Sequence, residues 1–168
     1  RGGALDWEPG MSLAETLDHA IDDRSVSTLD EAAEQLETLL ADAVAMRMES
    51  DVPLGAFLSG GIDSSLISAL ARRAQPGGTL RTFTVSMPEL GFDASRQAAT
   101  VARHLGTDHQ EVDLTLADAF DRIPRLPAIW DGPFADPSML PTALLCAAAR
   151  RHLSVCRGGD GGDELRAA

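Results

Sequence analysis

Residues 59–65, Ser-Gly-Gly-Ile-Asp-Ser-Ser, constrain the fold more than any other stretch of the sequence. An apolar run typical of a strand precedes them at 52–58, and apolar residues at helical spacing follow at 66–71. Adjacent glycines let backbone amides converge, and the start of a helix adds unpaired N–H groups and a partial positive charge. The stretch therefore predicts a loop that holds phosphate groups.

Asp63 adds a negative charge that would repel phosphate, so it fits this loop best if it binds Mg2+ that bridges to the phosphates. The order of residues in this stretch does not match three other known loop motifs. No lysine follows the glycines as in a Walker loop, Gly-x-Gly-x-x-Gly is absent, and no Gly-x-Ser-x-Gly surrounds Ser59. An ordinary glycine-rich turn is the alternative. The added Asp-Ser-Ser favours the pyrophosphate loop of enzymes that split ATP into AMP and pyrophosphate.

Composition narrows the class of protein. A length of 168 residues corresponds to about one domain. The net charge of −12 argues against a nucleic-acid partner, which would need clustered positive charge. All 14 basic residues are arginine, so a lysine that contacts phosphate would have to come from outside this chain. No signal sequence or membrane span is recognisable, and Cys146 and Cys156 are expected to be buried thiols, which favours a cytoplasmic location.

Helical and strand patterns alternate along the chain. We predict helices at about 12–23, 28–49, 64–74, 95–105, 116–123 and 139–152, and strands at 54–58, 80–86, 109–114 and 154–156. In the second of these helices, Leu29, Ala33, Leu36, Leu40, Val44 and Met48 recur at helical spacing, so one face is expected to pack on the body. Four prolines predict that 124–138 is mostly irregular. This alternation indicates an α/β fold with a parallel sheet and a ligand at its C-terminal edge.

A second group of charged residues follows the last predicted strand. Residues 159–164, Gly-Asp-Gly-Gly-Asp-Glu, place three carboxylates in a glycine-rich loop. Acids gathered this closely indicate either a cation or plain exposure to solvent. The spacing does not fit an EF-hand, which needs a glutamate at its twelfth position. With a phosphate loop upstream, we favour a Mg2+ ion shared by the two loops.

Five motifs in this order resemble the synthetase domain of glutamine-hydrolysing asparagine synthetases. They are residues 51–65, 92–93, 102–109, 133–138 and 159–164, and the likeness extends from about Trp7 to Leu165. The resemblance implies a three-layer parallel sheet with helices on both faces, of the adenine nucleotide alpha-hydrolase-like class (PP-loop ATP pyrophosphatases). It also implies that 1–27 is a linker after an upstream glutaminase domain and that 28–168 is part of the synthetase domain.

The activity implied by the resemblance has two steps. The side-chain carboxylate of aspartate attacks the α-phosphate of ATP, and ammonia from glutamine then displaces AMP to give asparagine. By position in the family, Ser59, Gly60, Gly61, Ser64 and Ser65 would hold pyrophosphate. Asp63 and Asp163 would bind Mg2+, and Asp160 would assist adenylate formation. Leu58, Val85 and Gly159 would contact the adenosine through backbone groups, and Gly158 is a further residue expected to bind the nucleotide.

The sequence departs from the family pattern at a few positions. Gly158 replaces a usual serine, Arg157 an apolar strand residue, and Ala94 a common glutamate. In the family, a long helical remainder that supplies a lysine to the phosphates follows the position of Leu165, whereas this sequence ends at Ala168. We therefore expect a partial catalytic unit that forms the nucleotide half-site.

Two alternatives stay open: a synthetase that closes a β-lactam or macrolactam by the same adenylation, and a noncatalytic nucleotide-binding module. A homodimer is a further expectation. His104 and His109 are interpreted as surface or supporting residues rather than general bases.

Overall fold

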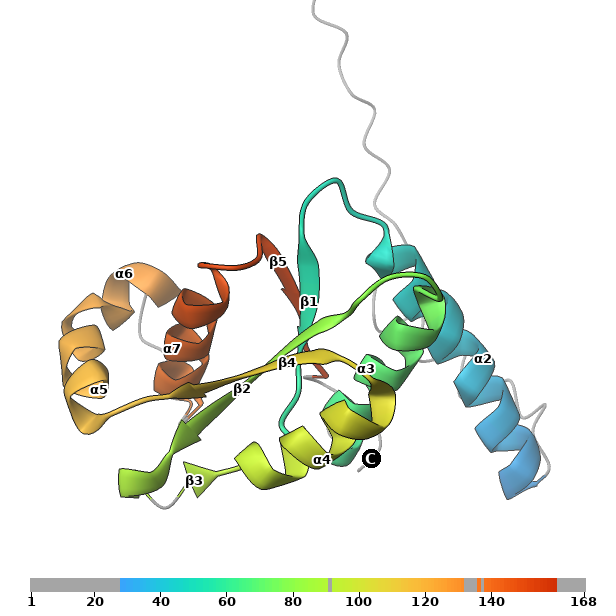
Figure 1. Ribbon diagram of the computed structural model, residues 1–168, viewed down its shortest axis with the longest axis horizontal. Helices are drawn as coiled ribbons and strands as arrows, with labels where there is room; N and C mark the ends of the chain where they lie inside the picture. The colour runs from blue at the N-terminus through green and yellow to red at the C-terminus, as the bar shows by residue number, and fades with distance from the viewer. Residues whose placement is uncertain (1–27, 91, 132–135, 137, 160–168) are drawn as a thin grey trace, which may run out of the picture. The chain divides into compact units, whose positions relative to one another are not determined.

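The computed structural model describes residues 28–90, 92–131, 136 and 138–159, which Figure 1 shows as a ribbon. The chain divides into two compact units, residues 1–39 and 40–168. Helix α2 (Leu29–Met48) begins in the first unit with a capping box. The Glu31 N–H donates to Thr28 Oγ1 at 3.2 Å, and the Thr28 N–H donates to Glu31 Oε2 at 3.1 Å. The helix expected near 12–23 lies outside the described residues.

The second unit contains a sheet whose four longer strands are parallel. They are β1 (Leu54–Phe57), β2 (Arg81–Met87), β4 (Asp108–Asp113) and β5 (Val155–Arg157), in the spatial order β4-β2-β1-β5. The two-residue strand β3 (Phe92–Asp93) pairs antiparallel with the end of β2, beyond the point where β1 stops. The predicted parallel sheet is confirmed, and β3 is an addition that the sequence pattern did not indicate.

Helices α5 (Leu116–Arg122) and α7 (Met139–Ala149) cover one face of this sheet. Alternate residues of β2 point toward them: Val85 and Met87 pack with Leu114, Ala119 and Leu144, while Phe83 packs with Ala149 and Leu153. All of these side chains are at least nine-tenths buried. The period of two in β2 therefore supplies one continuous apolar face, as expected for a strand covered by helices.

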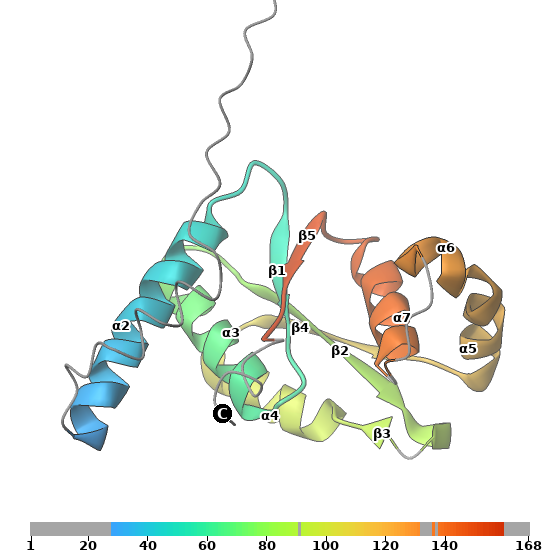
Figure 2. The ribbon, with the colours of Figure 1, turned by 180° about the vertical axis from the view of Figure 1, so that it is seen from behind.

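Helices α3 (Ile62–Ala74) and α4 (Ser95–Leu105) cover the opposite face (Figures 1 and 2). Leu58 packs against α4, and Leu54 packs with residues of α3. The second part of α2 joins this layer, because Val44 and Met48 are buried in the same core cluster. The packing predicted for α2 is therefore confirmed in residues 40–48. Leu29, Ala33 and Leu36 belong to the other unit.

Three expectations from the sequence are corrected. Residues 123–130 are not irregular, because they form the 3-10 helix η2 (Ile123–Arg125) and helix α6 (Leu126–Trp130). A proline stands in the first turn of each helix, where a backbone N–H would have no acceptor within the helix. Proline is therefore favourable at the start of these two helices and does not prevent them. Helix α7 ends at Ala149 rather than at 152, because the chain turns there and buries Leu153.

The third correction concerns the two cysteines, both of which are thiols. Cys146 is exposed on α7, whereas Cys156 on β5 is partly buried. Burial, with a smaller contribution from Cys146, raises the pKa of the Cys156 thiol to about 12. Cys156 is therefore protonated at neutral pH and behaves as a small apolar residue of the sheet. Of the described helices, none is both long enough and apolar enough to cross a membrane.

Gly55 in β1 offers a test of the sheet packing. A Cβ atom there would collide with Leu153 and would lie 2.6 Å from the carbonyl oxygen of Arg81. We expect Gly55→Ala to lower the free energy of unfolding by about 1–3 kcal/mol, because neither β2 nor the Leu153 turn can move freely. Urea denaturation measures this. Gly77→Ala is the matched control, since nothing lies within 4 Å of its added Cβ. Equal effects of the two variants would contradict this packing.

A polar contact on the α4 face of β2 gives a pH-dependent prediction. Thr82 Oγ1 lies 2.9 Å from His109 Nδ1, and His109 Nε2 is buried with no hydrogen-bond partner among the described residues. Burial lowers the pKa of His109 below 6.5, although Glu111 opposes this shift. Near pH 6, His109 therefore binds more protons in the unfolded chain than in the folded one. The contribution of neutral His109 to the free energy of unfolding is fully present above pH 6.5 and is lost as the pH falls through the lower pKa of the folded state.

We expect the free energy of unfolding to decrease from pH 7 to pH 5, and His109→Asn to make that decrease smaller. The measurement is urea denaturation at several pH values. His104→Asn is the control, because His104 is exposed on α4. If the slope against pH stays the same in His109→Asn, protonation of His109 does not oppose folding.

Candidate nucleotide-binding site

The loop between β1 and α3 turns sharply and is held by its own serines. Ser59 Oγ and Ser64 Oγ are 2.9 Å apart, and the N–H groups of Ser59 and Gly61 donate to Ser64 Oγ and Ser59 Oγ at 3.2 and 3.3 Å. The first bond of helix α3 runs from the Ser65 N–H to the Gly61 carbonyl oxygen. The loop thus leads into a helix N-terminus, whose backbone N–H groups and partial positive charge favour an anionic ligand.

Gly60 allows this turn to lie close to α4. Its φ of +81° is in the left-handed region, which glycine adopts without steric cost. A Cβ there would also lie 2.5 Å from Gln97 Cβ and 2.7 Å from the Ala98 nitrogen. Two independent constraints, backbone conformation and close approach to α4, thus require glycine at this position.

Strand β5 brings the second motif to the same place. Because β5 pairs in parallel with β1, the residues after both strands emerge at one edge of the sheet. A Cβ on Gly159 would lie 3.0 Å from the Ser64 nitrogen and from the Asp63 carbonyl carbon. Gly159, where the predicted acidic loop begins, therefore contacts the predicted phosphate-binding loop at 59–65. Asp160 and Asp163 lie outside the described residues, so their predicted roles stay predictions.

A cavity of about 270 Å³ opens beside these two turns. Six predicted residues line it: Leu58, Ser59, Ser64, Val85, Gly158 and Gly159. Four other predicted residues, Gly60, Gly61, Asp63 and Ser65, belong to the adjoining loop and helix start. The Oγ of Ser65 is buried there without a hydrogen-bond partner among the described residues. The structure thus brings together every predicted site residue that it describes.

Sequence reasoning missed the wall formed by the beginning of α7. Pro141, Thr142 and Leu145 line the cavity together with Ser138. Ser138 stands in one of the five motifs, which is the only signal that pointed here, whereas the Ala/Leu pattern of the helix indicated core packing alone. Asp136 Oδ1 accepts from the Ser138 N–H at 2.7 Å, and hydrogen bonding from Ser138 lowers the pKa of Asp136. This turn fixes the start of α7 at the cavity.

Two departures from the family pattern have structural counterparts. The Arg157 guanidinium donates twice to the carbonyl oxygen of Arg47, at 3.0 Å from Nε and 2.7 Å from Nη2. That carbonyl belongs to the last turn of α2, where a cation is favourable, so Arg157 attaches β5 to this helix. Ala94 lines the cavity, and its small side chain leaves space there. His104 and His109 do not line the cavity.

Residues 35–168 match the model of the Asparagine synthase family.

The chain belongs to the asparagine synthase family.

Among curated relatives, glutamine-hydrolyzing asparagine synthetase 1 of Bacillus subtilis is 34% identical over 136 residues, which cover 81% of this chain and 21% of that protein. A putative glutamine-hydrolyzing asparagine synthetase 2 of Methanocaldococcus jannaschii is 38% identical over 132 residues, covering 79% of this chain and 25% of that protein. The chain thus spans about a fifth to a quarter of the length of these relatives.

The described fold is also similar to a solved structure, the NH3-dependent NAD synthetase of Campylobacter jejuni. The TM-score is 0.48 at 19% identity, and the match covers 79% of this chain and 58% of that one. The predicted α/β class, a parallel sheet with helices on both faces, is confirmed by the strand pairing and the packing of the helices. The assignment to the adenine nucleotide alpha-hydrolase-like class stays a prediction.

Gly60 provides a test of the loop geometry. We expect Gly60→Ala to lower the free energy of unfolding by about 1–3 kcal/mol and to speed amide hydrogen exchange in residues 59–66, because alanine is strained at a φ of +81°. Gly61→Ala is the matched control. The φ of Gly61 is −69°, and its added Cβ would come no closer than 3.4 Å to another residue. Indistinguishable exchange in the two variants would show that the turn does not need glycine at 60.

Proposed function

We propose that this chain forms the ATP-binding part of an enzyme that makes asparagine by adenylating the side-chain carboxylate of aspartate. One observation carries the proposal: the Gly159 turn contacts Asp63 and Ser64 beside a cavity at the C-terminal edge of the sheet. Parallel α/β sheets bind their ligands at this edge. Membership of the asparagine synthase family and the names of the curated relatives support this chemistry.

The described residues suit an adenine nucleotide in one orientation. The apolar part of the cavity, with Leu58, Val85 and Leu145, suits the adenine ring and the ribose. The start of α3 and the hydroxyl groups of Ser59 and Ser64 suit the β- and γ-phosphates, because N–H and O–H groups there can donate to oxygen anions. The α-phosphate would then lie between the two turns, within reach of an acceptor carboxylate.

In the first step, a carboxylate oxygen of aspartate bonds to the α-phosphorus, and the bond between the α-phosphorus and the bridging oxygen breaks to release pyrophosphate. In the second step, ammonia bonds to the acyl carbon, and AMP leaves with the electron pair of the broken C–O bond. The N–H groups at the start of α3 stabilise the negative charge that develops on pyrophosphate. Asp160 is proposed to assist the first step by its place in the family motif.

The residues around the loop fit a Mg2+ ion. Asp63 lies in the first turn of α3, partly buried, with the Ser59 and Ser64 hydroxyl groups on the same loop. Oxygen donors of this kind are those that Mg2+ prefers. Asp163 is the proposed second carboxylate, carried by the turn that begins at Gly159. When bound, the ion would neutralise charge on the phosphates, which this chain of net charge −12 would otherwise repel.

Further parts of the proposal concern the whole protein. Ammonia would come from glutamine through a glutaminase domain that precedes the linker at 1–27, as the names of the glutamine-hydrolyzing relatives suggest. Residues 28–168 would then be part of the synthetase domain. A cytoplasmic location and a homodimer complete the proposal. A lysine contacting the phosphates would have to come from outside this chain, because all 14 basic residues are arginine.

Exchange of labelled pyrophosphate into ATP tests the first step in the full-length protein. We expect exchange to require Mg2+ and aspartate, and Asp63→Asn to reduce it by about 100-fold or more, because the variant loses a metal ligand. Asp51→Asn is the matched control, since Asp51 is exposed at the other end of β1. Undiminished exchange in Asp63→Asn would rule out the metal assignment.

The choice of acceptor separates this proposal from its alternatives. Exchange that depends on aspartate and is followed by asparagine formation with ammonia supports the synthetase. Exchange that needs a carboxylate bearing its own amine, with release of a cyclic amide, would identify a lactam-forming enzyme. Saturable ATP binding without exchange for any carboxylate would identify a noncatalytic nucleotide-binding module.

A further inference from the structure

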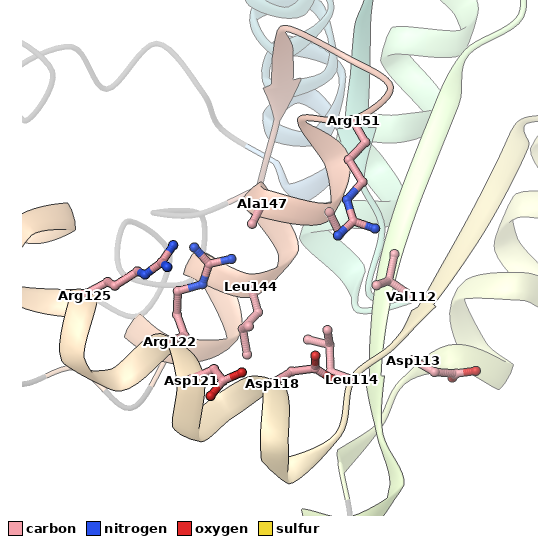
Figure 3. A pocket seen from close by; sticks show the side chains of 11 residues that line it. Val112, Asp113, Leu114, Asp118, Asp121, Arg122, Arg125, Leu144, Ala147 and Arg151 are labelled. Carbon is pink, nitrogen blue, oxygen red and sulfur yellow. The ribbon is translucent and has the colours of Figure 1, made fainter.

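A second cavity, of about 560 Å³, lies beside the end of β4, between α5 and α7 (Figure 3). Its volume is within the range of small-molecule sites in proteins. Helix α7 separates it from the nucleotide cavity: Leu144, Ala147 and Ala148 face this cavity, whereas Pro141 and Thr142 line the other. The two cavities therefore lie against different sides of one helix.

Three arginines from three segments converge on this cavity. Arg122 and Arg125 extend toward it from α5 and η2, and Arg151 extends from the turn after α7 on the opposite side (Figure 3). Arg122 and Arg125 are three positions apart in consecutive helical turns, a spacing at which like charges repel. Among the described residues, no carboxylate lies within ion-pair distance of either guanidinium group. An anion between them would remove this repulsion.

The acidic residues nearby do not remove the repulsion between Arg122 and Arg125. Asp118 is engaged by Thr115, whose N–H and hydroxyl group donate to Asp118 Oδ2 at 2.9 and 2.6 Å. These hydrogen bonds, with a smaller attraction from Arg151, lower the pKa of Asp118, which is the N3 residue of the capping box of α5. Asp113 and Asp121 are exposed at the rim. No group of three His, Cys, Asp or Glu residues in the described part of the chain could hold a metal ion.

The floor of the cavity is apolar. Leu114 and Leu144 are both nine-tenths or more buried and face the space between the arginines, with Val112 beside them. Apolar surface next to guanidinium groups suits a ligand that has an apolar body and an anionic group.

We propose that this cavity binds a small molecule that carries a carboxylate or phosphate group on an apolar body. The anionic group lies between Arg122 and Arg125, with Arg151 facing it, and the apolar body lies on Leu114 and Leu144. Planar guanidinium groups match the paired oxygens of both kinds of anion, so carboxylate and phosphate share one recognition chemistry. The inference goes beyond the proposed function and does not depend on it.

Two simple probes, benzoate and phenyl phosphate, test the site. The 168-residue chain is titrated with each at constant ionic strength while NMR follows the Nε–H signals of Arg122 and Arg125 and the backbone amides of the whole chain. We expect saturable shifts at both arginines and at Leu144 with one or both probes, and the stronger probe identifies the preferred anion. We also expect the double variant Arg122→Gln/Arg125→Gln to weaken the affinity at least tenfold.

The double variant Arg96→Gln/Arg103→Gln is the matched control, because both arginines are exposed on α4 and their replacement also removes two positive charges. An equal loss of affinity in this control would mean that binding follows net charge alone, and it would overturn the proposal. Linear, non-saturating shifts with both probes would also overturn it. Shifts confined to Gly60 and Gly61 would overturn it as well, because they would place the probes in the predicted phosphate-binding loop at 59–65.

Discussion

The contact between two glycine turns is the constraint on which the rest of this structure depends. A Cβ added at Gly159 would lie only 3.0 Å from Asp63 and Ser64, and one added at Gly60 would lie 2.5 Å from α4, so both close approaches favour a residue without a side chain. With larger residues, the turns after β1 and β5 would separate, and the N–H groups at the start of α3 would no longer face the cavity. The sheet thus positions two loops that come from distant parts of the sequence.

Much of this arrangement could be predicted from the sequence, because local rules decide it. The glycines and serines at 59–65 specify a strand, a tight turn and a helix start, and the capping box of Thr28 and Glu31 marks where α2 begins. Gly106, with a φ of 65°, ends α4 as its position in the pattern predicts. Parallel pairing follows from the alternation of helices and strands.

What could not be predicted depends on which elements become neighbours. The wall that Pro141 and Thr142 give to the nucleotide cavity exists because α7 crosses β2, and periodicity along α7 shows only an apolar helix. The same holds for Arg122, Arg125 and Arg151, which three segments bring together. Proline breaks a helix in its interior but not in its first turn, so the prolines that predict an irregular segment at 124–138 do not reveal the helices at 123–130.

The pairing of β1 with β5 also has a consequence for how the chain reaches its native state. Leu54 pairs with Val155, so most of the polypeptide lies between the two partners. Closing so long a loop is entropically unfavourable until other contacts have shortened it, which places this pairing late in folding. Until this pairing forms, the chain has the first glycine turn without the second beside it. The nucleotide cavity is therefore complete only when the most distant pair of strands has joined.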